Sequence, residues 1–340
     1  MAFDRLTRRE VIAAAPLVLL APGLVRAQPA DASVWRFLAI GDWGRDGNLG
    51  QKETAAGLAE VWDDTAPDFI VGTGDNFYHW GVWSVNDHRW KTCFEDIYPA
   101  RLKPWYPVLG NHDYGGSVQA QLDRAARDDR WRMEGRCWDR VFTHPRRPPL
   151  HLFFFDTVGW IGREYFPFTL YGAGIDAATQ AEQRATMERA LDRSPEDAIR
   201  IAVGHHGIYS VGPHGGRKEL EPLDALLRRH KVAAWVHGHD HCLFHVENDG
   251  MHYVCSGAGS EVLPKERIGP DGCALLAGCN GNEQPRMRSF FRRSSDPAKN
   301  IDGGFALFEV GARSGRFDFY GRRGTQVGKL EGGGAEIYRR

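Results

Sequence analysis

The stretch Gly238-His239-Asp240-His241 follows the apolar run Val232-Ala233-Ala234-Trp235-Val236, which predicts a buried strand. Because glycine permits a sharp turn, two imidazoles placed two residues apart at a strand end can reach one point or two adjacent points. A His-x-His pair alone is a weak metal signal, since loop histidines also serve as hydrogen-bonding groups. Whether this pair binds metal therefore depends on partners from the rest of the chain.

The bulk composition is that of an ordinary globular protein. Of the 340 residues, 42% are hydrophobic and 26% are charged, and the formal net charge at pH 7 is -1. This length suits one large core or two smaller ones. No basic stripe recurs along the chain, which argues against nucleic acid as the main partner. After the N-terminal segment, no apolar stretch is long enough to cross a bilayer, so we expect no membrane span in the mature protein.

The N-terminus has the pattern of an export signal. A basic head containing three arginines is followed by an apolar stretch over residues 11–25, and Val25-Arg26-Ala27 offers a cleavage site. Thr7-Arg8-Arg9-Glu10-Val11 resembles a twin-arginine signal, and an ordinary Sec signal that carries two arginines remains the alternative. We therefore expect residues 1–27 to be a signal peptide and the mature protein to be periplasmic or secreted.

Beyond the signal, no long linker rich in Pro, Ser and Gly divides the chain. We expect one domain over residues 28–330 and a monomeric protein. Three glycines near the start of residues 331–340 predict a frayed C-terminal tail there.

The six cysteines allow 15 pairings, and disulfides are expected in an exported protein. Cys273 and Cys279 flank a short glycine-containing loop and are the first candidates for a bond. Cys242 and Cys255 lie in apolar surroundings that suit buried thiols. The pairing itself stays open.

Apolar runs alternate with helix-prone segments along the chain, which is typical of an α/β fold. Strands are expected over residues 34–40, 68–73, 105–109, 152–155, 201–203, 232–236, 252–256, 304–310 and 316–320. Helices are expected over residues 48–64, 84–98, 117–131, 177–191 and 219–230, and a loop over residues 280–300. Because fewer helices separate the later strands, we predict an α/β (α+β) fold with two packed mixed β-sheets flanked by helices.

Five of these apolar strands run into glycine and then into a side chain that can bind metal. The five side chains are Asp42, Asp75, Asn111, His205 and His239. Functional sites of α/β sheets assemble beyond the carboxyl ends of the strands, so these residues can converge on one place. A single Asp after a strand is often only a turn residue. Five such junctions with this mixture of donors are hard to explain by turn chemistry.

Tyr78 and His241 extend this set to seven potential ligands, which is too many for one metal ion. Two ions can share them if one carboxylate bridges, as in two-metal hydrolases whose ions lie roughly 3.5–4 Å apart. A free phenol has a pKa of about 10, so Tyr78 becomes an effective ligand only beside a strongly charged ion. That requirement favours a trivalent ion such as ferric iron among the hard oxygen donors.

Five sequence blocks resemble the signature blocks of the purple acid phosphatases, which belong to the calcineurin-like metallophosphoesterases. The blocks are Gly41-Asp42-Trp43-Gly44, Gly74-Asp75-Asn76-Phe77-Tyr78, Gly110-Asn111-His112-Asp113, Gly204-His205 and Gly238-His239-Asp240-His241. The resemblance runs from about residue 35 to residue 320 and is strongest to the small, tartrate-resistant type. Tyr78 is the discriminating residue, because other members of the superfamily generally lack it. The resemblance implies the four-layer metallophosphoesterase sandwich.

The resemblance also implies roles for individual residues. It assigns Fe3+ to Asp42, Tyr78 and His241, a divalent ion (Fe2+, Zn2+ or Mn2+) to Asn111, His205 and His239, and a bridging position to Asp75. A phenolate bound to ferric iron would colour the protein purple or pink. His112 and His214, together with Asn111, are implied to contact the phosphate and the leaving group. Small phosphorylated compounds are the implied substrates, with phosphoproteins as a further class.

The match to the family blocks is ambiguous at one ligand and gives no information on the cysteines. A literal Val-x-x-His pattern starting at Val203 selects His206, whereas alignment of the whole block selects His205, which follows the glycine directly. We take His205 as the ligand. The cysteines that form a bridge in mammalian relatives have no counterparts near Val158 or Gly216, so the resemblance gives no disulfide.

The sequence thus leads to the hypothesis of an acid phosphatase that hydrolyses phosphate monoesters with a dinuclear metal centre and a metal-bound hydroxide nucleophile. In this hypothesis His112 protonates the leaving oxygen. Two other readings stay open: a phosphodiesterase on the same site, and a non-catalytic iron or redox protein. For the two histidines, the alternatives are a structural hydrogen-bond donor at His112 and an ordinary loop histidine at His214.

Overall fold

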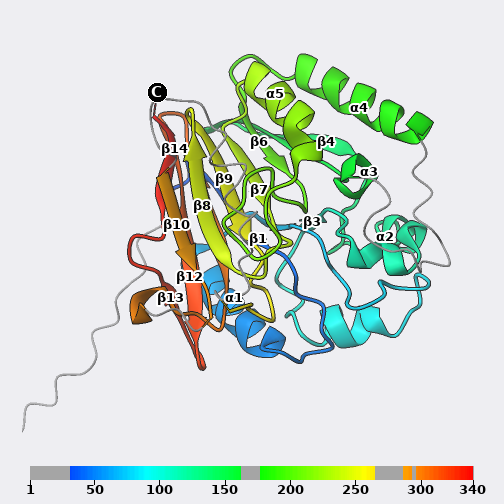
Figure 1. The fold of residues 1–340 in the computed structure, drawn as a ribbon, viewed down its shortest axis with the longest axis vertical. Helices are drawn as coiled ribbons and strands as arrows, with labels where there is room; N and C mark the ends of the chain where they lie inside the picture. Colours follow the sequence, from blue (N-terminus) through cyan, green and yellow to red (C-terminus); the bar gives the residue numbers. More distant parts are fainter. Residues whose placement is uncertain (1–30, 162–176, 265–285, 293–295, 340) are drawn as a thin grey trace, which may run out of the picture. The chain divides into compact units, whose positions relative to one another are not determined.

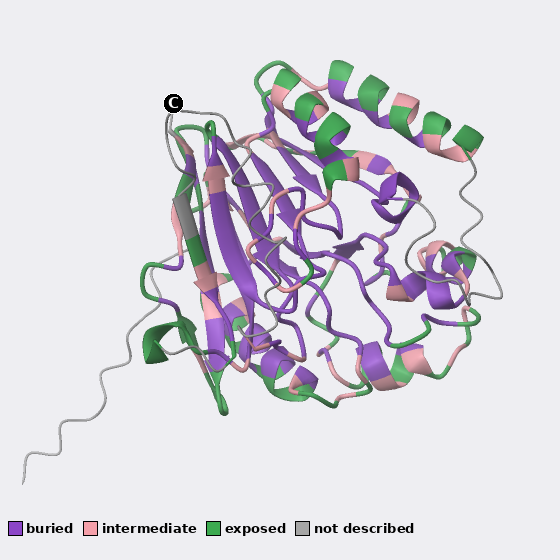
Figure 2. Cartoon of the chain, viewed as in Figure 1, coloured by how far each residue is buried: buried purple, intermediate pink, exposed green. Residues whose placement is uncertain are grey.

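Two seven-stranded mixed sheets form the centre of the fold (Figure 1). The computed structural model describes residues 31–161, 177–264, 286–292 and 296–339. Residues Asp31–Arg340 form one compact unit, in which the strands of both sheets are largely buried (Figure 2). The expected signal peptide, Cys273 and Cys279 lie outside the described residues.

The first sheet has the order β13-β12-β11-β1-β2-β3, and β14 also pairs with β12. Its strands are β1 (Trp35–Ile40), β2 (Phe69–Gly72), β3 (Trp105–Pro107), β11 (Gly303–Val310), β12 (Ser314–Arg323), β13 (Gln326–Lys329) and β14 (Ala335–Arg339). The strands β1, β2 and β3 run parallel, whereas β11 is antiparallel to β1. The loops that follow the three parallel strands therefore leave from the same edge of the sheet.

The second sheet has the order β10-β8-β9-β7-β6-β5-β4. Its strands are β4 (Trp138–His144), β5 (Arg147–Phe154), β6 (Ile199–Val203), β7 (Ala234–His237), β8 (Leu243–Asn248), β9 (Met251–Ser256) and β10 (Arg286–Phe290). The four strands β5, β6, β7 and β9 run parallel to one another, while β4 pairs antiparallel with β5, β8 with β9, and β10 with β8.

Because side chains alternate between the two faces of a strand, the buried apolar side chains form three separate clusters. In β1, Phe37 and Ala39 belong to a cluster with Val203 and Val236 of the second sheet, which places this cluster between the sheets. The neighbouring residue Leu38 points the other way, into a cluster with helix α1 (Gln51–Thr65) and four tryptophans. Helix, sheet, sheet and helix thus form four layers, as the resemblance of the sequence blocks implied.

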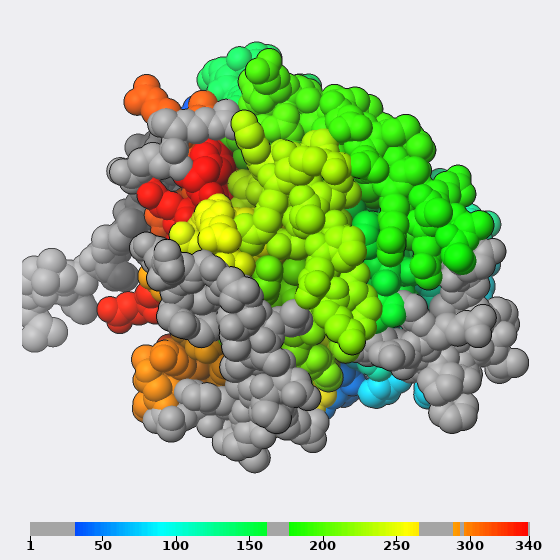
Figure 3. Space-filling view, turned by 45° about the horizontal axis from the view of Figure 1, so that its top comes forward, coloured from blue at the N-terminus to red at the C-terminus, as the bar shows by residue number. Residues whose placement is uncertain are grey.

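The outer face of the second sheet is covered by α4 (Ala177–Asp192) and α5 (Glu221–Arg229). Leu223 and Leu227 of α5 are fully buried against Trp235 of β7 and other residues of this layer. The green residues of this region cover much of the face shown in Figure 3. The other helical segments of the described residues are α2 (Val118–Arg124), α3 (Val158–Ile161), a π-helical turn (Trp90–Glu95) and short 3-10 turns at His112–Gly115, Lys218–Leu220 and Pro297–Lys299. None of the helices within the described ranges is long and apolar enough to cross a membrane.

Two expectations about the C-terminal part are wrong. The predicted tail contains β14, which pairs with β12 and buries the side chain of Ile337. The ten-residue strand β12 is long enough to pair with both β13 and β14, so the glycines at 332–334 form a turn between strands. Within the expected loop over residues 280–300, Arg286–Phe290 forms β10 beside β8. In both places a segment forms a strand because its backbone pairs with a neighbouring strand, although its own sequence does not favour one.

Candidate metal centre

The side chains at the five predicted strand ends lie together at one edge of the two sheets. Asp42, Asp75 and Asn111 follow β1, β2 and β3 of the first sheet, and His205 and His239 follow β6 and β7 of the second. All five are buried, with exposed fractions between 0% and 5%. The parallel strands of each sheet deliver their carboxyl ends to the same edge, which explains why residues so far apart in the chain meet.

The hydroxyl of Tyr78 is the centre of a first group of donor atoms. It lies 3.0 Å from Asp42 Oδ1, 2.9 Å from Asp75 Oδ2 and 3.0 Å from His241 Nε2. His241 Nε2 is also 3.5 Å from Asp42 Oδ1. Three hard oxygen donors and one imidazole therefore converge on one buried point, which is a donor set suited to ferric iron.

A second group of donors surrounds the Nε2 atom of His205. This atom lies 3.0 Å from Asn111 Oδ1 and 3.4 Å from Asp75 Oδ1, while Nδ1 of the same ring contacts the carbonyl oxygen of Thr73 at 2.8 Å. The ring of His239 is 5.1 Å from that of His205. Because Nδ1 is engaged by a carbonyl, Nε2 is the atom left to bind a metal ion, and the second group suits a divalent ion.

Asp75 belongs to both groups. Its Oδ2 atom faces Tyr78, whereas its Oδ1 atom faces His205 and accepts a hydrogen bond from the backbone N–H of His112 at 2.8 Å. One carboxylate thus presents one oxygen to each group of donors, which is the arrangement a bridging ligand requires.

Three of the candidate ligands have strained backbones. The φ angles are 60° at Asp42, 51° at Asp75 and 69° at His239, in the left-handed region that non-glycine residues seldom adopt. Such strain persists only where the surrounding structure imposes it, and it concentrates at functional sites. The strained turns direct these side chains toward the shared edge immediately after the strands end.

Glycines before the candidate ligands permit the close approach of the loops. A Cβ atom at Gly110 would lie 2.2 Å from Asp75 Oδ1, and one at Gly238 would lie 2.5 Å from Asp42 Oδ2. Neither distance is compatible with a side chain. These two positions therefore need glycine because a carboxylate from another loop occupies the space.

The chain matches the family model described as calcineurin-like phosphoesterase over residues 36–243. The chain belongs to this family. Purple acid phosphatase 17 of Arabidopsis thaliana is 37% identical over 247 residues, which cover 68% of this chain and 70% of that protein. Tartrate-resistant acid phosphatase type 5 of Rattus norvegicus is 31% identical over 308 residues, covering 87% and 89% of the two chains.

Within the calcineurin-like phosphoesterases, these relatives establish the purple acid phosphatase branch that the sequence blocks predicted. The chain is therefore a metal-dependent phosphoric monoester hydrolase with a two-metal centre. Among solved structures, GAP50, the anchor in the inner membrane complex of Plasmodium, superposes with a TM-score of 0.68 at 25% identity, covering 88% of this chain and 89% of that one.

Burial and mutual charge govern the protonation of this phosphoesterase site in the absence of metal. Burial alone would lower the pKa of His205, but the neighbouring Asp75 and Asp42 outweigh it and raise that pKa to about 9. Burial lowers the pKa of His241 to about 3 and raises the pKa of Tyr78 well above its usual value. A bound metal requires a neutral His205, so metal binding and proton release are coupled here.

The two predicted catalytic histidines flank the donor groups. The ring of His112 is 4.4 Å from that of Tyr78, and its Nε2 atom is 3.9 Å from Asp75 Oδ2; a quarter of its side chain is exposed. The exposed His214 places its ring 4.5 Å from that of His239, and its backbone N–H donates to Asp240 Oδ1 at 2.7 Å. Both histidines border the site and remain accessible to a substrate.

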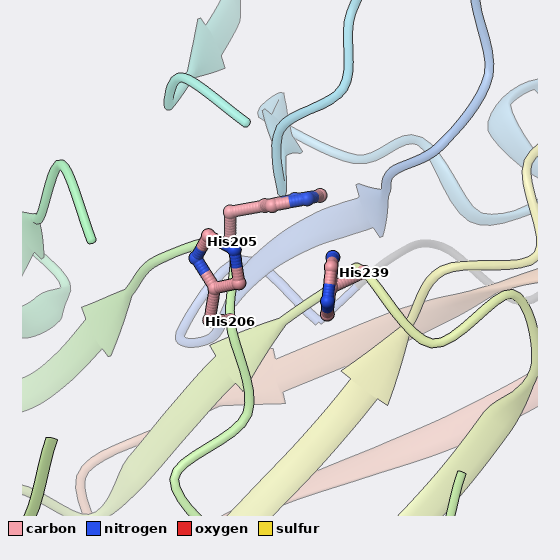
Figure 4. Close-up of side chains that lie close together, drawn as sticks. All are labelled: His205, His206 and His239. Carbon is pink, nitrogen blue, oxygen red and sulfur yellow. The ribbon is translucent and has the colours of Figure 1, made fainter. Parts of the chain in front are cut away.

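His206, the alternative to His205 in the sequence, also lies at the site. Its ring is 4.4 Å from that of His239 and 4.9 Å from that of His205, so the three imidazoles form one cluster that could hold a metal ion (Figure 4). Nδ1 of His206 contacts the hydroxyl of Thr157 at 2.7 Å, and the backbone N–H of the same residue donates to that hydroxyl. Thr157 thereby orients this ring, whereas Nε2 of His205 is the atom that faces Asn111 and Asp75.

Asp113 and Asp240 anchor the loops that carry the candidate donors. The carboxylate of Asp113 accepts hydrogen bonds from the backbone N–H groups of Asn76, Phe77 and Gly110 and from the side chain of Gln121. It therefore ties the loop after β2 to the loop after β3. Asp240 accepts hydrogen bonds from the Ser210 hydroxyl and the His214 backbone.

Sequence reasoning missed two arginines at the site. The guanidinium of Arg45 lies over the ring of Tyr78, and Arg217 Nη2 lies 3.4 Å from His239 Nε2. The sequence hinted at Arg45 only through its position directly after Gly41-Asp42-Trp43-Gly44. No spacing rule predicts which residue the charged end of a long side chain will contact.

The four cysteines within the described ranges are free thiols. Cys242 and Cys255 are completely buried, as the apolar surroundings predicted.

Proposed function

We propose that the phosphatase activity of this chain depends on two ions held by the two donor groups. Asp42, Tyr78 and His241 would hold the first ion, and Asn111, His205 and His239 would hold the second. Asp75 would bridge the two. The observation that supports this assignment most directly is the division of the Asp75 carboxylate, whose two oxygens face Tyr78 and His205 separately.

The donor chemistry supports Fe3+ at the first position, because a buried phenol needs a highly charged ion to act as a phenolate. The second position combines one amide oxygen with two imidazoles, which suits Fe2+, Zn2+ or Mn2+. His205 rather than His206 is the proposed ligand, because Nε2 of His205 faces both Asn111 and Asp75.

When bound, the ions supply charge neutralisation for the phosphoryl oxygens and lower the pKa of a water molecule. The protein groups around them position and protonate the substrate. Asn111 contributes an amide at the site where the phosphate would lie. His112 is the proposed proton donor to the leaving oxygen, since its ring is partly exposed and is fixed through Nδ1 by the carbonyl of His79 at 2.9 Å.

His214 is the proposed second contact to phosphate. Its backbone is anchored by Asp240 while its side chain remains exposed beside His239. Its ring lies beside His239, whereas that of His112 lies beside Tyr78, so the two histidines would contact the substrate from different donor groups.

The proposal also covers localisation, substrate and oligomeric state. The protein would be a monomer that is exported to the periplasm or the medium. It would act on small phosphorylated compounds, with phosphoproteins as a further class. The basic and apolar pattern of residues 1–27 supports export.

Release of the aryl alcohol by purified protein, measured on a monoester and on a diester, tests this function against its alternatives. We expect faster hydrolysis of an aryl phosphate monoester than of the matching diester, and loss of both activities after chelation. A higher rate on the diester would favour a phosphodiesterase. A metal-loaded protein that cleaves neither compound would favour a non-catalytic role.

A further inference from the structure

Arg45 carries a positive charge onto the face of the Tyr78 ring. Its guanidinium carbon lies 3.5 Å from the ring centroid, and only 8% of its side chain is exposed. Tyr78 itself is 4% exposed. A cation and an aromatic ring are therefore in direct contact in a buried environment, where their electrostatic interaction is little screened.

The backbone holds these two residues in register. The N–H of Tyr78 donates to the carbonyl of Gly44 at 2.8 Å, which joins the loop after β1 to the loop after β2 immediately beside Arg45. The N–H of Arg45 donates to the side chain of Gln51, the buried first residue of α1, at 3.0 Å. The stacking is thus built into the fold and does not depend on a flexible surface side chain.

The charge of Arg45 is only weakly opposed by its other neighbours. Glu261 Oε2 is 3.6 Å from Nη2, and His79 Nε2 is 3.4 Å from Nη1, both longer than the 2.7–2.9 Å of a typical charge-assisted bond. Among the described residues, the buried Nε atom of Arg45 has no hydrogen-bond partner. The positive charge therefore also acts on the ring of Tyr78, whose centroid is 3.5 Å from the guanidinium carbon.

The donor atoms and the arginine occupy different parts of Tyr78. Asp42, Asp75 and His241 gather around the hydroxyl, whereas the guanidinium covers the ring face. A positive charge over the ring lowers the energy of the filled orbitals of a tyrosinate. It lowers the orbitals of an ion beyond the hydroxyl less, because that ion is farther away. It also stabilises the reduced form of that ion relative to the oxidised form.

We propose that Arg45 is a positioning residue that tunes the tyrosinate ligand, and through it the colour and the reduction potential of the iron. This inference rests on the proposed function, because it requires Tyr78 to bind ferric iron. Arg45 would raise the energy of the tyrosinate-to-iron charge-transfer transition and raise the potential of the ferric/ferrous couple. It would thereby set how readily the iron can be reduced.

The test compares the visible spectrum and the reduction potential of iron-loaded wild type, Arg45→Leu, Arg45→Lys and Glu261→Gln. Arg45→Leu should shift the charge-transfer maximum to longer wavelength and lower the potential. Arg45→Lys should restore part of both values, because it returns the charge without the planar guanidinium. Glu261→Gln should shift both values the opposite way, because it removes the carboxylate opposing Arg45.

The sign reversal separates tuning from structural support. If Arg45 only packed against the ring, Glu261→Gln would leave the band in place or shift it in the same direction as Arg45→Leu, which would overturn the inference. Purple protein with identical maxima in all four forms would overturn it as well, while leaving the proposed function intact. Wild-type protein that binds no iron would overturn the proposed function together with the inference. Should Arg45→Leu fail to fold, Arg45→Gln takes its place as the variant without the charge, with the same expected shifts.

Discussion

Asp75 Oδ2 lies 2.9 Å from the hydroxyl of Tyr78, while the other oxygen of the same carboxylate lies 3.4 Å from His205 Nε2. Tyr78 belongs to the loop of the first sheet and His205 to the loop of the second. A single buried side chain therefore couples the donors that each sheet contributes.

Asp75→Asn keeps the shape of this side chain and removes its charge. We expect both ions to bind at least about 100-fold more weakly, because changes outside the ligand shell already cost up to about that much. Phosphatase activity should fall with metal content. Metal titration checks this, with Asp63→Asn as the control, since Asp63 forms an exposed ion pair with Arg101. Unchanged binding of both ions by Asp75→Asn would refute the bridging role.

His112→Asn tests the proposed proton donor. We expect hydrolysis of alkyl phosphates, which have poor leaving groups, to slow by about 10²–10⁴-fold. Activated aryl phosphates should be affected much less, because their leaving groups need no proton. The aryl substrate thus serves as the internal control. Equal losses on the two substrates would show that His112 is not the acid.

His205→Ala and His206→Ala distinguish the two neighbouring imidazoles. Nε2 of His205 faces Asn111 and Asp75, whereas Thr157 contacts Nδ1 of His206. We expect His205→Ala to lose the divalent ion and keep the iron with its colour, while His206→Ala keeps both ions. Elemental analysis of the purified variants checks the prediction. The reverse pattern would move the ligand assignment to His206.

A histidine pair outside the metal centre should limit stability in acid. His245 Nε2 lies 3.0 Å from His252 Nδ1, and their strand partners are Arg288 and Glu247. Burial and then the neighbouring His252 lower the pKa of His245 to about 3. The unfolded chain, in which this pKa is about 6.5, then binds more protons than the folded chain between pH 6.5 and pH 3.

Stability should therefore fall as the pH drops through that window, by about 1.4 kcal/mol per pH unit for a histidine that is neutral only when folded. Urea unfolding of wild type and His245→Gln at several pH values measures the slope. The variant should show a smaller slope, whereas His88→Gln, which removes a histidine that is 75% exposed, should retain the wild-type slope. Equal slopes for wild type and His245→Gln would argue against this prediction.

The sequence predicted the central strands of both sheets and the candidate donors that follow them because both depend on local patterns, but it did not predict β4, β8, β10, β13 or β14. An apolar run followed by glycine and a polar donor is visible at Asp42, Asp75 and His239, and the parallel order of the strands then brings such ends together. The strand β14 was missed because three glycines precede it, and pairing with β12 is decided by contacts about twenty residues away. The contact between Arg45 and Tyr78 could not be predicted from the sequence either, since it depends on the hydrogen bond from the backbone N–H of Tyr78 to the carbonyl of Gly44.

Elemental analysis combined with a visible spectrum of the purified protein tests the central assignment most directly. We predict two metal ions per chain, at least one of them iron, and a visible charge-transfer band that disappears in Tyr78→Phe. The band should be present before any substrate is added, because its donor is the protein's own side chain. A colourless wild-type protein without iron would contradict the assignment of Tyr78 as a ligand.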